Sequence, residues 1–219
     1  MPDALDFKKA YRDLYWPSLE PSEILVPAMT FVMTDGRGDP NAEGGAYQQA
    51  VELLYALAYA IKMSPKHRQA PDGYYDYVVP PLEGLWWKED PADFDFSNKE
   101  KFCWTMMIRQ PEFVTPVVFE KACAEVKKKK PALDMDKVRL QVFEEGLCVQ
   151  AMHIGPYATE DATLKKIETF IRNHGLVDDI SAVTTGGTVR RHHEIYLGDP
   201  RKTAPEKLRT VLRHPVRRA

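Results

Sequence analysis

Apolar residues recur with helical spacing in three segments of the chain. The longest pattern covers Asn41–Met63, and Ser64-Pro65 ends it. A second apolar face covers Glu160–His174, which Gly175 closes. A shorter repeat predicts a closing helix from Pro205 through Leu212, with exposed arginines on its outer face and in a frayed tail. We therefore expect three helices that each bury one side.

Helix-start and helix-stop residues predict two further helices. Residues 6–14 are expected to form a short helix that Trp16-Pro17 ends. Thr115 followed by Pro116 is typical of a helix start. That helix ends with Lys127–Lys130, where the helix dipole favours positive charge. The lysine run is thus explained as a solvated helix end, without nucleic-acid binding.

Strands are predicted where apolar and β-branched residues cluster or alternate between turn residues. The predicted strands are Glu23–Thr34, Tyr74–Pro80, Lys101–Gln110, Val138–Phe143, Cys148–Ile154 and Val189–Leu197. Glu144-Glu145-Gly146 indicates a hairpin turn, and residues 90–100 indicate a surface connection. The order of elements predicts an α+β fold whose two halves have similar contents, which is consistent with an internal duplication.

Composition limits the function. The 219 residues suffice for one large or two small domains without disulfides. The net charge of −2 provides no general attraction for nucleic acid or an anionic membrane, and the apolar runs are too short to span a bilayer. The acidic N-terminus does not resemble a secretory signal, and three scattered cysteines suit a reducing compartment. We expect a cytoplasmic protein.

The last predicted strand carries the clearest candidate chemistry. Strand alternation places His192, Glu194 and Tyr196 on one face and His193 and Ile195 on the other. If both faces of the sheet are covered, Glu194 is a carboxylate in partly apolar surroundings, which favours pairing, protonation or a functional role. The alternative is an exposed face on which Glu194 pairs with Arg190, Arg191 or a neighbouring lysine. The pattern alone leaves both open.

Other chemistries find little support. His153, His192 and Glu194 could supply metal ligands, but no ligand motif with metal spacing is present. The chain has no nucleophile elbow, no dinucleotide-binding fingerprint and no phosphate-binding loop. We therefore expect neither a metal nor a cofactor.

Three segments carry a resemblance that goes beyond composition. His153–Tyr157, His192–Val216 and Met107–Phe113 closely resemble the GyrI-like small-molecule-binding family in its stand-alone branch. The resemblance covers the chain from about residue 20 to 216. It implies a pseudo-two-fold pair of strand-helix-strand-strand modules with a ligand groove between them.

The resemblance also implies a division of the chain. Residues 1–20 would form an N-terminal arm, residues 21–216 the domain, and residues 217–219 a short tail. Within the domain, the two modules would span about 21–114 and 131–216.

Some relatives are drug-sensing domains fused to a DNA-binding region, which is not expected here. Other stand-alone relatives hydrolyse cyclopropanoid compounds that alkylate DNA. The family's central acidic residue corresponds to Glu194, and its aromatic wall to Trp86, Trp104 and Tyr157. The resemblance therefore implies a hydrolase that opens a strained cyclopropane ring and protects the cell from xenobiotics.

In that reading, Trp86, Trp104 and Met106 enclose a flat substrate, and Glu194 deprotonates the attacking water. Tyr157 donates a hydrogen bond to the oxygen on which negative charge develops. Further expected ligand contacts are His192, Tyr196 and His153.

Two alternatives do not require chemistry. The same aromatic residues and carboxylate could bind lipophilic cations, as in a multidrug-binding or sequestering module. A third reading, suggested by a gyrase-inhibiting relative, is inhibition of a protein partner. The hydrolase and the cation-binding module use the same residues, so the sequence does not decide between these two functions.

Overall fold

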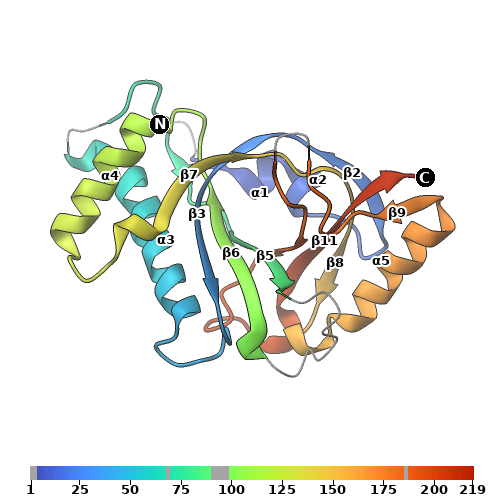
Figure 1. Ribbon diagram of the computed structural model, residues 1–219. Coiled ribbons are helices and arrows are strands. Elements are labelled where there is room, and N and C mark those ends of the chain that lie inside the picture. Colours follow the sequence, from blue (N-terminus) through green and yellow to red (C-terminus); the bar gives the residue numbers. More distant parts are fainter. Residues whose placement is uncertain (1–3, 68–69, 90–98, 185–186) are drawn as a thin grey trace. The chain divides into compact units, whose positions relative to one another are not determined.

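The computed structural model describes residues 4–67, 70–89, 99–184 and 187–219. The chain forms two compact units. The first contains residues 1–7, 29–80 and 87–142, and the second contains residues 8–28, 81–86 and 143–219. Helices and mainly antiparallel strands occur in both units, which confirms the α+β class (Figure 1).

The first unit is built on strands β3 and β6, which pair antiparallel. Its elements are β1 (Leu5–Asp6), β3 (Met29–Arg37), α3 (Ala46–Lys62), β4 (Tyr77–Val78), β6 (Phe102–Arg109), α4 (Pro116–Lys129) and β7 (Val138–Phe143). Strand β7 lies beside β3, and β1 pairs with β4 in parallel. Helix α3 packs on β3 and β6, and α4 packs on α3.

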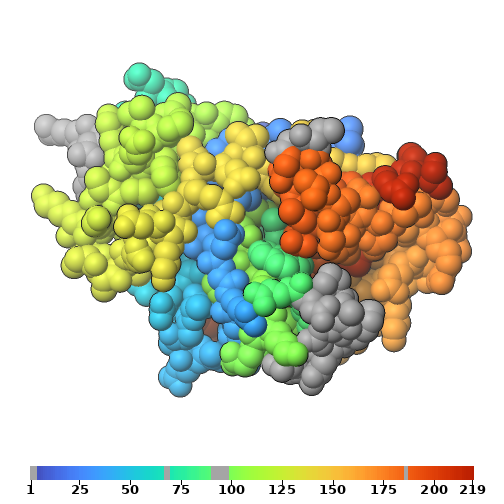
Figure 2. Space-filling view, viewed as in Figure 1, coloured from blue at the N-terminus to red at the C-terminus, as the bar shows by residue number. Residues whose placement is uncertain are grey.

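Both helices of this unit follow from their sequences. The predicted apolar face of α3 is buried, from Ala50 through Ile61. At the start of α4, the Thr115 side chain accepts a hydrogen bond from the Val118 amide at 3.4 Å. The outer face of α4, which ends in lysines, lies on the surface (Figure 2).

The second unit is an antiparallel sheet with the strand order β2, β8, β11, β10, β5. Its elements are α2 (Arg12–Tyr15), β2 (Ser22–Val26), β5 (Leu82–Lys88, of which residues 82–86 belong here), β8 (Gly146–Ile154), α5 (Asp161–Asn173), β9 (Leu176–Asp178), β10 (His192–Tyr196) and β11 (Arg209–Arg218). The short helix α1 (Phe7–Ala10) precedes α2, so the predicted helix over residues 6–14 is two short pieces.

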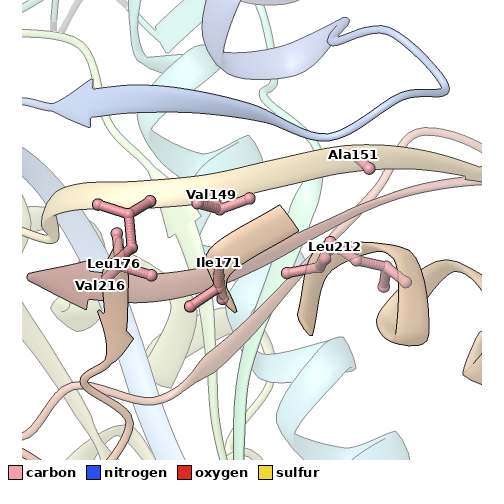
Figure 3. Close-up of a cluster of buried hydrophobic side chains, with 7 residues drawn as sticks. Val149, Ala151, Ile171, Leu176, Leu212 and Val216 are labelled. Carbon is pink, nitrogen blue, oxygen red and sulfur yellow. The ribbon is translucent and has the colours of Figure 1, made fainter. Parts of the chain in front are cut away.

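Helix α5 covers one face of this sheet at β8 and β11. The apolar side chains between them form a core, shown in Figure 3. Its members are Val149, Ala151, Ile167, Ile171, Leu176, Leu212 and Val216. These side chains come from α5 and three strands, so they fix the helix against the sheet.

The predicted closing helix is wrong. Pro205 begins a single short turn, Pro205–Lys207, and the chain then forms β11, a central strand of ten residues. Because β11 is buried on both faces, its apolar and polar residues do not alternate. Leu208, Val211 and Leu212 therefore have the spacing of a helical face. Arg213, which was expected on a solvated helix face, is 1% exposed. Arg218, which was expected in a frayed tail, is the last residue of the strand.

Two other predictions on connections are wrong. The predicted strand Glu23–Thr34 is divided at Pro27-Ala28 into β2 and β3, which belong to different units. Proline lacks the amide that a continuous strand would need at that point. The expected hairpin at residues 144–146 is absent, since β7 pairs with β3 whereas β8 lies between β2 and β11.

Most of the predicted surface connection over residues 90–100 lies outside the described residues. Within the described part of the chain, no helix has the length and apolar character needed to cross a membrane.

Candidate functional site

The candidate site is built around β10, the predicted strand that carries Glu194. His193 and Ile195 are each 1% exposed, whereas His192, Glu194 and Tyr196 are half-buried on the opposite face. The predicted alternation of this strand is therefore confirmed. The Glu194 side chain retains 15% of its exposure, so the carboxylate is largely shielded but still reachable from one side.

Two side chains from the same strand hold the Glu194 carboxylate. His192 Nε2 donates to Oε1 at 3.1 Å, and the Tyr196 hydroxyl donates to Oε2 at 2.8 Å. The exposed pairing with Arg190 does not occur, because that guanidinium is bound to Asp179 at 2.6 Å. Glu194 is thus oriented by polar groups on its own face of the sheet.

Trp86 on β5 extends this arrangement. Its indole nitrogen donates to the Tyr196 hydroxyl at 2.8 Å. In the β5–β10 register, Trp86 is opposite His192, and Gly84 is opposite Glu194. Glycine contributes no side chain between these rows, so the indole and the phenol can meet across the row of Glu194. An aromatic side chain is therefore bonded to the same tyrosine that holds the carboxylate.

Tyr157 supplies a second ring. It begins the turn Tyr157–Thr159, and its ring packs edge-to-face on Tyr196 with centroids 5.8 Å apart. Its side chain is 39% exposed. Burial, together with the charges of Glu160, Glu194 and Asp199, raises the pKa of Tyr157 to about 12. The phenol is therefore protonated at neutral pH and available as a hydrogen-bond donor.

His153 was expected to contact the ligand, but it is 5% exposed and holds the Tyr157 turn. Its Nδ1 atom lies 3.0 Å from the Thr163 hydroxyl, and its Nε2 atom lies 3.2 Å from the carbonyl of Pro156. With both ring nitrogens used in this way, His153 positions the segment that carries Tyr157.

Glu160 is a site residue that sequence reasoning missed. It is 9% exposed at the start of α5, and its Oε1 atom is buried without a hydrogen-bond partner among the described residues. Burial and the nearby Glu194 raise the pKa of Glu160 to about 9, and the Thr210 hydroxyl offsets only part of this shift. A glutamate at the N-terminal end of a helix is ordinary in sequence, so nothing in the pattern indicated its burial.

Trp104 and Met106 belong to the first unit. Trp104 is 1% exposed and Met106 is fully buried. The Trp104 ring covers Gly36 on β3 and packs edge-to-face on Tyr47 with centroids 5.6 Å apart. Both residues are core side chains of that unit. The predicted site residues that the second unit brings together are Glu194, His192, Tyr196, Trp86 and Tyr157.

A charged network lies buried on the opposite face of β10. His193 is 3.0 Å from Glu83 through Nε2 and 3.0 Å from Glu145 through Nδ1. Arg213 on β11 also pairs with Glu145, at 2.9 Å. Burial disfavours the charge of each group, but attraction between the oppositely charged partners is the larger effect. The net result lowers the pKa of Glu145 to about 2 and raises the pKa of His193 to about 9. This network supports β10 from behind.

Among the described residues, no group of three or more His, Cys, Asp or Glu side chains is arranged to hold a metal ion. The alternative of a metal bound by His153, His192 and Glu194 thus gains no support from the geometry. The arrangement instead combines an oriented carboxylate, a second buried carboxyl group and aromatic rings. Such a set can orient a water molecule and contact a flat aromatic compound.

Comparisons with known proteins give a family match and similar folds. Residues 19–217 match the family described as the GyrI-like small molecule binding domain. The fold is similar to that of an uncharacterized conserved protein from Listeria innocua, at 49% identity and a TM-score of 0.89, over 97% of this chain and all of that one. A comparison with curated proteins gives no match.

Two further solved structures, both described as hydrolases from Listeria innocua, are also similar. One is 46% identical with a TM-score of 0.84 over 97% of this chain and all of the other. The second is 47% identical with a TM-score of 0.87 over 98% of this chain and all of the other. Since the family match covers nearly the whole sequence, the chain belongs to the GyrI-like small molecule binding domain family.

Proposed function

We propose that this protein is a hydrolase for flat aromatic compounds that carry a strained cyclopropane conjugated to a dienone. The observation that carries the proposal is the Glu194 carboxylate, which His192 and Tyr196 orient beside the rings of Trp86 and Tyr157. The description of two similar structures as hydrolases supports a hydrolytic reaction. The proposed product is an alcohol that no longer alkylates DNA, which gives protection from xenobiotics.

In the proposed reaction, each of these groups has one role. Glu194 accepts a proton from a water molecule whose oxygen bonds to the cyclopropane methylene carbon. The bond between that carbon and the ring carbon breaks, and its electron pair makes the dienone an aromatic phenolate. The Tyr157 hydroxyl donates to the developing oxyanion. Release of ring strain and gain of aromaticity supply much of the driving force.

The remaining side chains serve binding. Trp86 offers an aromatic surface to a flat substrate. The hydrogen bond of 2.8 Å from its indole nitrogen to the Tyr196 hydroxyl fixes the orientation of the ring. Tyr157, which is partly exposed, is placed to contact the same ligand. Because the Glu194 carboxylate is largely shielded, the water molecule that it activates is separated from bulk solvent.

The test uses a synthetic aryl-fused spirocyclopropyl cyclohexadienone incubated with the purified protein in isotopically labelled water. We expect a product that has gained one labelled water molecule, detected by mass spectrometry. Glu194→Gln should abolish turnover, whereas Glu206→Gln, which changes an exposed glutamate of the same unit, should leave it unchanged. Equal turnover by Glu194→Gln and the wild type would refute the proposal.

A second candidate is the binding of lipophilic cations without chemical change. The observation that favours it is the presence of two carboxyl groups, Glu160 and Glu194, that both act on Tyr157. Aromatic faces attract cations, and a nearby carboxylate neutralises them. Saturable binding of tetraphenylphosphonium that is lost in Glu194→Gln, without turnover of the dienone, would favour this function over hydrolysis.

A further inference from the structure

The burial of Glu160 requires an explanation, because the residue is not part of a salt bridge in the described part of the chain. Glu160 precedes α5 and is more than nine-tenths buried, with Oε1 lacking a hydrogen-bond partner among the described residues. Removing a carboxyl group from water without a partner is costly. A group of this kind is retained where it has a function or where it holds a proton.

The sheet register places Glu160 beside the candidate site. Its neighbour Thr210 on β11 is paired with Tyr196 on β10, and the Tyr196 hydroxyl is bonded to Glu194. Tyr157, three residues before Glu160 in the chain, packs its ring on the same Tyr196. Tyr157 and Glu194 therefore both contact Tyr196, and Glu160 lies beside Thr210, the residue paired with that tyrosine.

The charges around Glu160 oppose its ionisation. The charged groups that act on it are Glu194 on β10 and Asp161 on α5, and both are negative. Together with burial they raise the pKa of Glu160 to about 9, so the group holds its proton at neutral pH. Glu194 and Glu160 thus form a pair of carboxyl groups in unlike environments, an arrangement that separates a base from an acid.

We propose that Glu160 is the proton source of this site and that it acts through Tyr157, returning to the product the proton that the hydrolysis requires. The inference rests on the proposed hydrolase function. It assigns three roles to three side chains: Glu194 accepts the proton of water, Tyr157 donates to the substrate oxygen, and Glu160 restores the proton of Tyr157.

The proton balance closes within the site. The attacking water gives one proton to Glu194 and keeps the other on the product alcohol. Tyr157 gives its proton to the phenolate oxygen and takes one from Glu160, which becomes a carboxylate. Transfer of the proton from Glu194 to Glu160 then restores the starting state, so the net change is the addition of one water molecule to the substrate.

Two features of Glu160 suit this role. A phenol product has a pKa close to 10, and an acid of nearly equal strength transfers a proton to it without a large energy gap. The N-terminal end of α5 then stabilises the Glu160 carboxylate while it lasts, because the helix dipole is positive there. An ordinary exposed glutamate would be ionised at neutral pH and could not donate.

The first part of the experiment needs no substrate. Glutamate carboxyl groups labelled with carbon-13 are titrated by NMR in the wild type, Glu160→Gln and Glu194→Gln. We expect one resonance with a midpoint near 9 in the wild type, its loss in Glu160→Gln, and a lower midpoint in Glu194→Gln because the neighbouring charge is gone. A Glu160 resonance that titrates in the range of ordinary glutamates would overturn the inference.

The second part measures the pH dependence of turnover of the spirocyclopropyl dienone. The wild type should lose kcat as the pH rises through about 9, where Glu160 ionises. Glu160→Gln should lower kcat by roughly 100-fold with little change in KM, which is the usual scale for loss of a proton donor. Glu160→Asp, which keeps the acid, should recover part of the rate, and Glu168→Gln, which changes an exposed glutamate of helix α5, serves as the control.

The outcomes separate this inference from the proposed function. Turnover with an unchanged pH profile in Glu160→Gln would refute the proton relay and leave the hydrolase standing. No turnover by the wild type would refute both, even where NMR shows a protonated Glu160. A fall in thermal stability without any change in kcat would assign Glu160 a purely structural role and overturn the inference.

Discussion

The Tyr196 hydroxyl donates a hydrogen bond of 2.8 Å to Glu194 Oε2 and accepts one of the same length from the Trp86 indole. The phenol therefore connects the carboxylate to the aromatic side chain beside it. Because Tyr196 and Glu194 are two residues apart on one strand, both project from the same face and their spacing is set by the backbone. Orientation of the carboxylate depends on this bond.

Tyr196→Phe tests that dependence. The change removes the donor while it keeps the ring, and a hydrogen bond to a charged group contributes about 1.5–3 kcal/mol. We expect kcat/KM for the dienone to fall by roughly 10- to 100-fold. The matched control is Tyr77→Phe, since the buried Tyr77 hydroxyl has no hydrogen-bond partner among the described residues. Equal activity in the two variants would show that the Tyr196 bond does not orient Glu194.

Behind the site, Glu145 holds His193 and Arg213 in a buried network. Glu145→Gln keeps the size of the side chain but leaves two buried cations with less compensation. Breaking a buried ion pair in this way costs about 3–5 kcal/mol in the free energy of unfolding, measured by urea denaturation. Glu52→Gln is the control, because it removes a surface pair with Lys130 and should cost about 1 kcal/mol or less.

A loss in Glu145→Gln no larger than that in Glu52→Gln would contradict the structural role of the network. It would mean that the buried charges rearrange or become neutral when their partner is removed. The comparison is direct because both variants change one carboxylate to an amide.

The same groups predict how stability depends on pH. The folded pKa of His193 is raised from 6.5 to about 9, so its contribution is complete below 6.5 and is lost as the pH rises through about 9. The folded pKa of Glu145 is lowered from 4.5 to about 2, so its contribution is complete above 4.5 and is lost as the pH falls through about 2. Between them, the pair stabilises the fold most from 4.5 to 6.5.

Glu160 also lowers the free energy of unfolding as the pH rises. Its folded pKa is raised from 4.5 to about 9, so the folded state loses stability between these two pH values. We expect the free energy of unfolding to be higher at pH about 5.5 than at pH about 8.5, with a smaller difference in Glu160→Gln. A difference of the same size in that variant would show that Glu160 does not titrate abnormally.

Strand alternation in the sequence predicted that Glu194 shares a face with His192 and Tyr196. The structure agrees, because half-buried and buried positions alternate along β10. The sequence did not predict Glu160, and the reason is specific. Glu160 has Thr210 of β11 as a neighbour, and the segment that leads into β11 has apolar residues at helical spacing. A strand that is buried on both faces lacks the period of two that distinguishes strands from helices.

The buried network was missed for a related reason. Glu145 lies between Glu144 and Gly146, in a segment whose composition is typical of a turn, yet it is only 3% exposed. Its partners come from β10 and β11, which are far away in sequence. Local patterns report periodicity and turn preference, whereas pairing of distant charges is decided by the strand order of the sheet.

Trp104 was expected in a ligand-contacting wall, and its contact with Gly36 provides a test of its role in the core. A Cβ atom at residue 36 would lie 2.0 Å from the Trp104 ring, so Gly36→Ala forces the indole to move. Overpacking of this kind costs about 1–3 kcal/mol. We expect a lower urea midpoint for Gly36→Ala, while Gly198→Ala, whose Cβ would meet its nearest atom at 3.4 Å, should change it much less. If Gly36→Ala left stability unchanged, the Trp104 ring would be free to leave its place over β3, and its assignment as a fixed core residue would fail.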